Sequence, residues 1–179
     1  MDRRQVRVFG NRFGELFNDA VVSAAGVAGT YLRWRWRSAG VIVLPVHAGD
    51  IALVPAYRYL IGDVSLSFPA GRSTPAKPCA RPPSGSCAKR LAASTQMLGE
   101  VYAETGLIES SCAVVRVDVR AAVMARPEAM ESVAAPRWLS SGDTRQAIVS
   151  GEIRCGLTLA ALALYLASPV GHQPAGLER

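Results

Sequence analysis

The chain has 179 residues, of which half are apolar and 19% are charged, so one domain with a packed core is expected and global disorder is excluded. The net charge of +6 is compatible with a nucleic acid or with a phosphorylated small molecule as partner. The nearest candidate for a membrane span, residues 155–167, is too short to cross a bilayer and is expected to be a buried helix.

The N-terminus and the cysteines indicate a compartment. Charged residues throughout positions 1–7 leave no apolar core for a signal peptide, so a cytosolic location is expected. The four cysteines have no Cys-x2-Cys spacing, and His47 and His172 are not placed to complete a zinc site. We interpret the cysteines as reduced thiols, with a local disulfide between Cys79 and Cys87 as the alternative.

The first third of the chain predicts β-strands separated by glycine turns, and the last two strands are expected to form a hairpin. The predicted strands are residues 16–22, 30–36, 41–46 and 51–54.

Residues 31–37 combine aromatic side chains with arginines. Strand alternation places Tyr31 and the arginines on one face, and Leu32, Trp34 and Trp36 on the other. The simplest interpretation is an amphipathic edge strand with a solvated basic face. The functional alternatives are a dimer seam, or a basic lip over a diphosphate in which Tyr31 binds substrate; nucleic-acid binding is a weaker third.

The middle of the chain predicts a helix over residues 88–104, with Ser86 as its N-cap and Gly106 as its stop. On such a helix Glu100 and Glu104 are four residues apart and share one face. Unpaired carboxylates at that spacing repel each other, so they belong either on a solvated surface or around a divalent cation. The sequence leaves both interpretations open.

The remaining segments complete an α+β pattern. Residues 113–119 and 137–139 predict strands, and residues 126–135 predict a loop or an edge. Helices are predicted at residues 144–149 and 157–167. This order indicates one α+β domain over residues 1–167, a sandwich with a mixed sheet between helices, followed by a loose tail at residues 168–179.

Several segments resemble the Nudix hydrolase superfamily, in particular ADP-ribose pyrophosphatases and other nucleoside diphosphate sugar hydrolases. The stretch from Gly99 to Leu107 resembles the end of the Nudix box, and Phe68-Pro69-Ala70-Gly71 resembles the strand and turn that open it. Residues 53–59 look like the preceding strand, and residues 150–153 and 158–162 like the C-terminal helices. The resemblance implies a Nudix-type α/β/α sandwich with an N-terminal β-strand extension at about residues 6–38.

The box departs from the family pattern. Gly99 and Ala103 stand where the family has an arginine and a glutamate, and Ser67 stands where many of these hydrolases have a glutamate. These losses favour reduced or lost catalysis.

The box is also longer than usual. Gly71 precedes Glu100 by 100 − 71 = 29 positions, so the preferred alignment has an inserted loop at residues 72–85. The rival alignment starts the box at Gly85 and puts Leu91 in place of the first glutamate.

The resemblance implies hydrolysis of the pyrophosphate linkage of a nucleoside diphosphate sugar such as ADP-ribose, with Mg²⁺ as cofactor and Mn²⁺ as an alternative. It assigns metal binding to Glu104, Glu100 and the carbonyl of Ala70, and phosphate binding to Arg58. Of the tyrosines beside Arg58, at least one is expected to pack in the core. A further catalytic glutamate is expected in the region of Glu128 and Glu131.

The resemblance also implies a homodimer formed by the N-terminal strands around Gly29-Thr30-Tyr31. Two alternatives remain from other classes. One is a Nudix-fold protein that has lost hydrolysis and binds a nucleotide as a sensor, partner or scaffold. The other is a nucleic-acid-binding module that uses the strand of arginines and tryptophans.

Overall fold

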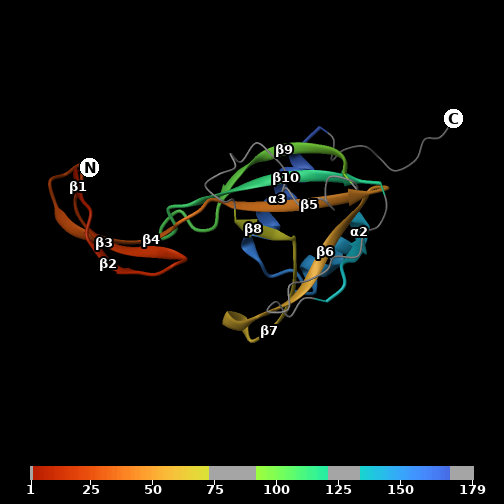
Figure 1. Ribbon diagram of the computed structural model, residues 1–179, viewed down its shortest axis with the longest axis horizontal. Helices are drawn as coiled ribbons and strands as arrows, with labels where there is room; N and C mark the ends of the chain where they lie inside the picture. Colours follow the sequence, from red (N-terminus) through yellow and green to blue (C-terminus); the bar gives the residue numbers. More distant parts are fainter. Residues whose placement is uncertain (1, 73–91, 121–133, 170–179) are drawn as a thin grey trace.

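The computed structural model describes residues 2–72, 92–120 and 134–169, which form two β-sheets and two α-helices. The N-terminal sheet projects from one end of the body (Figure 1). Its strands are all antiparallel: β1 and β2 pair with β3, and β4 pairs with β3 as well. These strands are β1 (Asp2–Arg4), β2 (Arg7–Gly10), β3 (Gly14–Val22) and β4 (Ala28–Trp36).

The body contains a seven-stranded mixed sheet in the order β11-β6-β5-β10-β9, with β7 paired to β6 and β8 paired to β5. Only the pair β5–β10 is parallel among the described strands. The 3-10 turn η1 (Tyr59–Ile61) joins β6 to β7. The strands are β5 (Gly40–His47), β6 (Asp50–Arg58), β7 (Asp63–Ser67), β8 (Ala70–Arg72), β9 (Ala92–Tyr102), β10 (Ser111–Val119) and β11 (Arg137–Leu139).

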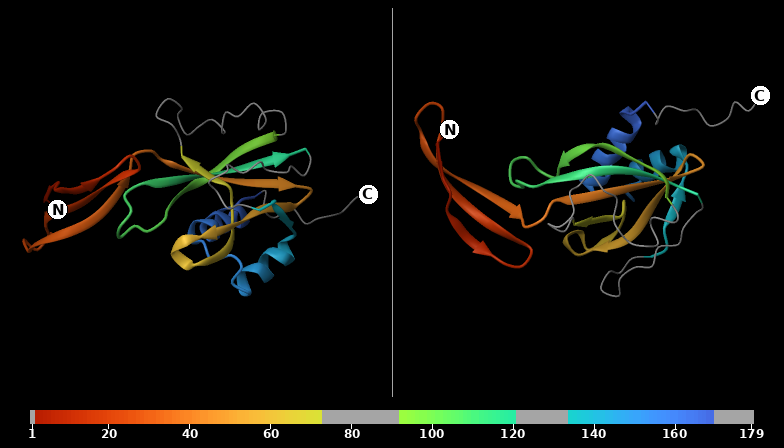
Figure 2. Two further views of the ribbon diagram at one scale, coloured as in Figure 1. Left: turned by 60° about the horizontal axis from the view of Figure 1, so that its bottom comes forward. Right: turned by 45° about the horizontal axis from the view of Figure 1, so that its top comes forward.

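Helices α2 (Ser141–Val149) and α3 (Gly156–Ala167) lie on one face of this sheet (Figure 2). The Ser140 side chain caps α2 by accepting a hydrogen bond from the Asp143 amide at 3.1 Å. Apolar side chains of β5, β6 and β10 pack against the helices and form the core. Its buried members include Leu44, Leu53, Val114, Ala161 and Leu162.

Most of the predicted elements are confirmed. The first four strands correspond to β3, β4, β5 and β6, and β5 and β6 form the expected hairpin with His47 opposite Asp50. Strands β10 and β11 and helices α2 and α3 also lie where they were predicted. The region 126–135 and the tail 168–179 fall largely outside the described residues.

The helix predicted over residues 88–104 is wrong, because residues 92–102 form the edge strand β9. Strand β10 offers this segment a complete row of backbone partners, and Leu98 and Val101 pack against the core. Val114 pairs with Gly99 and Val115 with Met97, so Leu98 is the extra residue of a β-bulge. Pairing and burial have overridden the helical preference of an alanine-rich segment.

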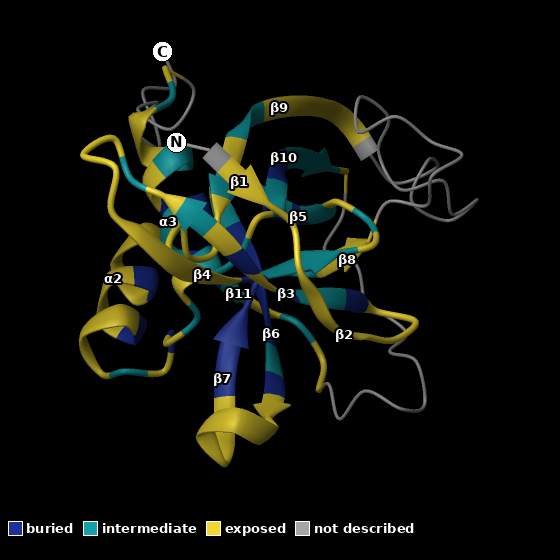
Figure 3. Ribbon diagram, turned by 90° about the vertical axis from the view of Figure 1, so that its left-hand side faces the viewer, coloured by how far each residue is buried: buried dark blue, intermediate teal, exposed yellow. Residues whose placement is uncertain are grey.

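The described part of the chain contains no helix that is both long and apolar enough to cross a membrane. In Figure 3 the exposed residues cover much of the N-terminal sheet and the tip of the β6–β7 hairpin, whereas β7 itself is mostly buried. Among the described residues, the tip carries the two most exposed large apolar side chains, Tyr59 and Leu60.

Candidate functional site

The segment Pro69-Ala70-Gly71, expected as a turn, enters strand β8 at Ala70 and is held against β5 of the body sheet. The Pro69 carbonyl accepts a hydrogen bond from the Val43 amide at 2.9 Å, and Ala70 pairs with Ile42 of β5. This segment therefore has a fixed position on the sheet.

Arg58 lies at the end of β6, and its guanidinium Nη2 donates a hydrogen bond to the Ser67 hydroxyl, just before the turn. A hydroxyl carries no charge, so this contact orients the guanidinium without neutralising it. Tyr57 and Tyr59 are 52% and 87% exposed, which shows that the expectation of a core tyrosine here is wrong. Near the hairpin tip, Arg58 therefore follows one exposed tyrosine in sequence and precedes another.

The two carboxylates expected to share a helix face are separated by the true secondary structure. Glu100 is exposed on β9, whereas Glu104 lies in the turn that follows the strand. The Glu104 backbone carbonyl accepts the amides of Leu107 and Ile108, at 3.3 and 2.8 Å. The shared face was a property of the predicted helix and disappears with it.

Sheet register also separates Glu100 from the turn. Glu100 pairs with Ala113, Ala113 with Val41, and Val41 with Gly71, so three strand spacings lie between Glu100 and Gly71. At about 4.8 Å per spacing this is roughly 14 Å. Strands β5 and β10 thus lie between Ala70 and Glu100, and the structure does not bring these two residues together.

Among the described residues there is no group of three histidine, cysteine or acidic side chains that could hold a metal ion. The sequence between β8 and β9, residues 73–91, contains no aspartate or glutamate at all. Glu128 and Glu131 lie outside the described residues. The acidic side chains that the structure places do not fit the magnesium site that the resemblance implies.

Arg33 forms a buried polar centre between the N-terminal sheet and the body, which sequence reasoning missed. Its side chain is only 5% exposed; Nε donates to Asp19 Oδ2 at 2.7 Å, and Nη1 contacts Glu109. The guanidinium also lies 4.0 Å from the centroid of the Phe17 ring. The expected alternation is confirmed, but the prediction of a solvated basic face is wrong at Arg33.

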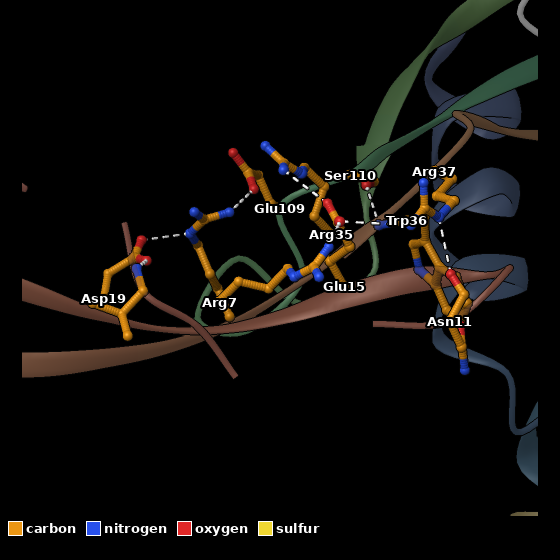
Figure 4. A network of polar contacts seen from close by, with 11 residues as sticks. Arg7, Asn11, Glu15, Asp19, Arg35, Trp36, Arg37, Glu109 and Ser110 are labelled. Atoms are coloured by element: carbon orange, nitrogen blue, oxygen red, sulfur yellow. Dashed lines mark hydrogen bonds and ion pairs between the residues drawn. The ribbon is translucent and has the colours of Figure 1, made fainter. Parts of the chain in front are cut away.

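The same network depresses acidic pKa values on β3. The hydrogen bond from Arg33, with help from the Val6 amide and the nearby Arg3, holds the pKa of Asp19 below its ordinary value. Hydrogen bonds from Arg35 and Arg7 do the same for the pKa of Glu15. Figure 4 shows this line of charged side chains. The sheet therefore keeps its acids ionised at neutral pH.

Backbone hydrogen bonds attach the loop after β9 to the free edge of β4. The Trp34 amide donates to the Leu107 carbonyl at 2.8 Å, and the Glu109 amide donates to the Trp34 carbonyl at 2.9 Å. The Trp36 amide donates to the Ser110 hydroxyl at 3.0 Å. The loop that contains Glu104 is thus a docking strand for the N-terminal sheet.

A second junction involves Arg72, the last residue of β8. Its Nη1 donates to the Phe13 carbonyl at 3.0 Å, and its guanidinium lies 4.1 Å from the centroid of the Trp36 ring. Tyr31, expected to bind substrate, is 42% exposed on β4 opposite Asp19. It belongs to a different sheet from Arg58, and the structure does not bring the two together.

The sequence matches no protein-family model and no curated protein sequence. The structure is similar to a solved one titled "Crystal structure of ADP compounds hydrolase", with a TM-score of 0.69, over 92% of this chain and 89% of that one. The two sequences are 13% identical, so the likeness shows a shared fold. The expected α+β fold of Nudix type is confirmed.

Proposed function

We propose that this protein binds a nucleoside diphosphate compound without metal-dependent hydrolysis. The observation that carries the proposal is β9, which occupies the segment expected to be the metal-binding helix. With Glu100 on an edge strand and no acidic residue between β8 and β9, the carboxylate cluster needed to hold Mg²⁺ is missing from this region. The fold likeness supports the choice of ligand class.

Arg58 is the proposed phosphate-binding residue. A guanidinium can bind a phosphate through two parallel hydrogen bonds. In Arg58, Nη2 donates to the neutral Ser67 hydroxyl, so the positive charge is not paired with an acid in this contact. Tyr57 and Tyr59, its neighbours in sequence, have exposed rings that could contact a base or a sugar. Tyr31 remains a second proposed contact, should the N-terminal sheet of another copy approach this tip.

Calorimetric titration with ADP-ribose, with ADP and with AMP, each with and without Mg²⁺, tests the proposal. We expect binding that does not require the metal and that falls at least tenfold in Arg58→Met. Arg145→Met, which removes an exposed arginine from α2, is the matched control and should bind as the wild type does. Loss of affinity in both variants would indicate a general charge effect, and absence of binding by the wild type would refute the proposal.

Hydrolysis of the same ligands with Mg²⁺ or Mn²⁺ is the second candidate, favoured by the fold likeness to a hydrolase. It would require Glu104 and Glu100 together with Glu128 or Glu131, in a site that the described residues do not show. Release of AMP from ADP-ribose that disappears in Glu104→Gln would establish it.

We also propose a cytosolic homodimer. The apolar face of the N-terminal sheet supports self-association, because Phe9, Leu32 and Val22 are exposed on it. A sheet of this size with one uncovered apolar face gains stability by packing against another surface. Light scattering of wild type and Leu32→Lys tests this point: a dimer that becomes a monomer is expected.

A further inference from the structure

The two faces of the N-terminal sheet differ in character. Exposed apolar side chains lie on the face that includes Leu32, and arginines gather on the opposite face, which also includes Tyr31. Strand register and ion pairs place five arginines on this second surface, which we call the arginine face. They are Arg3, Arg7, Arg33, Arg35 and Arg37.

The positive charge of the chain is concentrated in this part of the sequence. Residues 1–37 contain seven arginines, no lysine and three acidic residues, a surplus of four positive charges, whereas the net charge of all 179 residues is +6. A concentrated positive potential attracts polyanions and accelerates their association. The N-terminal sheet is therefore the region of this protein most suited to a polyanionic partner.

On the arginine face, three arginines share the single carboxylate of Glu15. Arg7 Nη1 and Arg35 Nη2 donate to its two oxygens at 2.9 and 3.0 Å, and Arg37 Nη2 lies 3.6 Å from it (Figure 4). One carboxylate neutralises one guanidinium, so this group keeps a surplus of two positive charges. The side chains of Arg7, Arg35 and Arg37 are 60%, 40% and 54% exposed, so a ligand can reach them.

Contacts within the sheet also hold these arginines in place. The Arg35 guanidinium lies 4.7 Å from the centroid of the Phe17 ring, and Arg37 Nε donates to the Asn11 carbonyl at 2.9 Å. A side chain that is already ordered loses less conformational entropy when it binds a ligand. The arrangement therefore favours binding of an anion by several arginines at once.

We propose that the arginine face binds the sugar-phosphate backbone of a single-stranded nucleic acid, with Tyr31 as the stacking surface for a base. Guanidinium groups bind phosphates through paired hydrogen bonds and stay charged at neutral pH. Tyr31 lies on the same face, opposite Asp19, and is 42% exposed, so its ring is accessible. A basic surface with an aromatic ring on it is typical of proteins that bind single strands. This role goes beyond the proposed function, which concerns the β6–β7 hairpin.

The positions of the apolar side chains favour a single strand over a lipid surface. A protein element that enters the headgroup region of a membrane buries apolar side chains there. Here the exposed apolar residues Val22 and Leu32 lie on the face opposite the arginines. The accessible ring of Tyr31 favours a single strand over a duplex, because only unpaired bases are free to stack on a side chain.

Fluorescence anisotropy with a labelled oligothymidylate of about 20 nucleotides tests the proposal on the full-length protein. If three arginines each contact a phosphate, the logarithm of the binding constant should fall with the logarithm of salt concentration with a slope of about −2. The affinity should then decrease about 20-fold between 50 and 200 mM salt. Absence of binding at 50 mM salt would overturn the proposal.

A double variant locates the binding surface. Arg35→Gln combined with Arg37→Gln should lower the affinity at least tenfold and reduce the salt slope by about 1.4, since two phosphate contacts are lost. The matched control is Arg137→Gln combined with Arg145→Gln, which removes two exposed arginines from the body and should bind within about twofold of wild type. Equal losses in the two double variants would overturn the assignment to the arginine face.

Two single variants keep the test independent of any effect of the double variant on folding. Glu15→Gln removes the shared carboxylate and should tighten binding several-fold, a gain that a purely structural role of Glu15 does not produce. Tyr31→Leu should weaken binding at least fivefold with the salt slope unchanged, because stacking involves no phosphate. Weaker binding by Glu15→Gln would contradict the role of the arginines, and an unchanged affinity in Tyr31→Leu would contradict stacking.

Two other probes identify the class of partner. A duplex of the same length should bind more weakly than the single strand, and tighter binding of the duplex would overturn the assignment to single strands. Vesicles that contain phosphatidylserine should not compete with the oligonucleotide at equal phosphate concentration. Vesicle binding that exceeds oligonucleotide binding would overturn the proposal in favour of a membrane surface.

Discussion

The Arg33 guanidinium donates from Nε to Asp19 Oδ2 at 2.7 Å, across the β3–β4 pair, and both side chains are buried. Replacing Arg33 with lysine keeps the charge and loses the fork that also reaches Glu109 and covers Phe17. We expect Arg33→Lys to lower the free energy of unfolding by about 1–3 kcal/mol, measured by urea denaturation. Arg35→Lys is the control on the same strand: its side chain is 40% exposed, so a change below about 1 kcal/mol is expected.

We expect the two acidic residues of β3 to make the folded protein less stable at low pH. The pKa values of Asp19 and Glu15 are lowered in the folded protein, so their contribution is present above their unfolded values and is lost as the pH falls through the lowered ones. Urea midpoints should be constant from about pH 7 to pH 5 and fall below about pH 4. The fall should be shallower in Asp19→Asn, and an equally steep fall in that variant would argue against a role for Asp19.

Gly14 lies against Trp34 in the N-terminal sheet. An added β-carbon would lie 2.4 Å from Trp34 Cζ2 and 2.7 Å from the Arg35 carbonyl oxygen, so Gly14→Ala should cost about 1–3 kcal/mol. Gly29→Ala is a matched substitution in the same sheet with no atom within 4 Å of the new carbon. It should change stability by less than about 1 kcal/mol. Thermal unfolding of the two variants compares them, and equal midpoints would contradict the packing described.

The body core predicts a conventional packing loss. Leu53 on β6 is fully buried, so Leu53→Ala should lower the free energy of unfolding by about 2–5 kcal/mol. Leu60, at the tip of the β6–β7 hairpin, is 94% exposed, and Leu60→Ala should stay within about 0.5 kcal/mol of wild type. Denaturant titration of both variants tests whether Leu53 is buried and Leu60 exposed. A large loss of stability in Leu60→Ala would contradict the exposed position of Leu60.

Local patterns identified most of the strands and both described helices because each has a period or a boundary that can be read within a few residues. The alternation in residues 31–37 was correct, and it implied that every arginine shares a face with Tyr31. A hairpin between β3 and β4 would have set Glu15 opposite Arg35, so the charge pairing on that face was within reach of the sequence. The contact between Arg33 and Glu109 could not be predicted from the sequence, because 76 positions separate the two residues.

The wrong prediction of a helix at β9 also arose because a contact between distant segments could not be read from the sequence. Alanines, a serine cap and a following glycine favour a helix locally, but the decision was made by β10, whose free edge lies beside this segment only after folding. The candidate site inherited the error, because the proximity of Glu100 and Glu104 depended on the helical period. By itself, the sequence determined the strand and helix pattern around the core and the resemblance of the turn Pro69-Ala70-Gly71, since these depend on neighbouring residues. Only the tertiary structure decided which carboxylates meet, because long-range strand pairing sets the distances between segments.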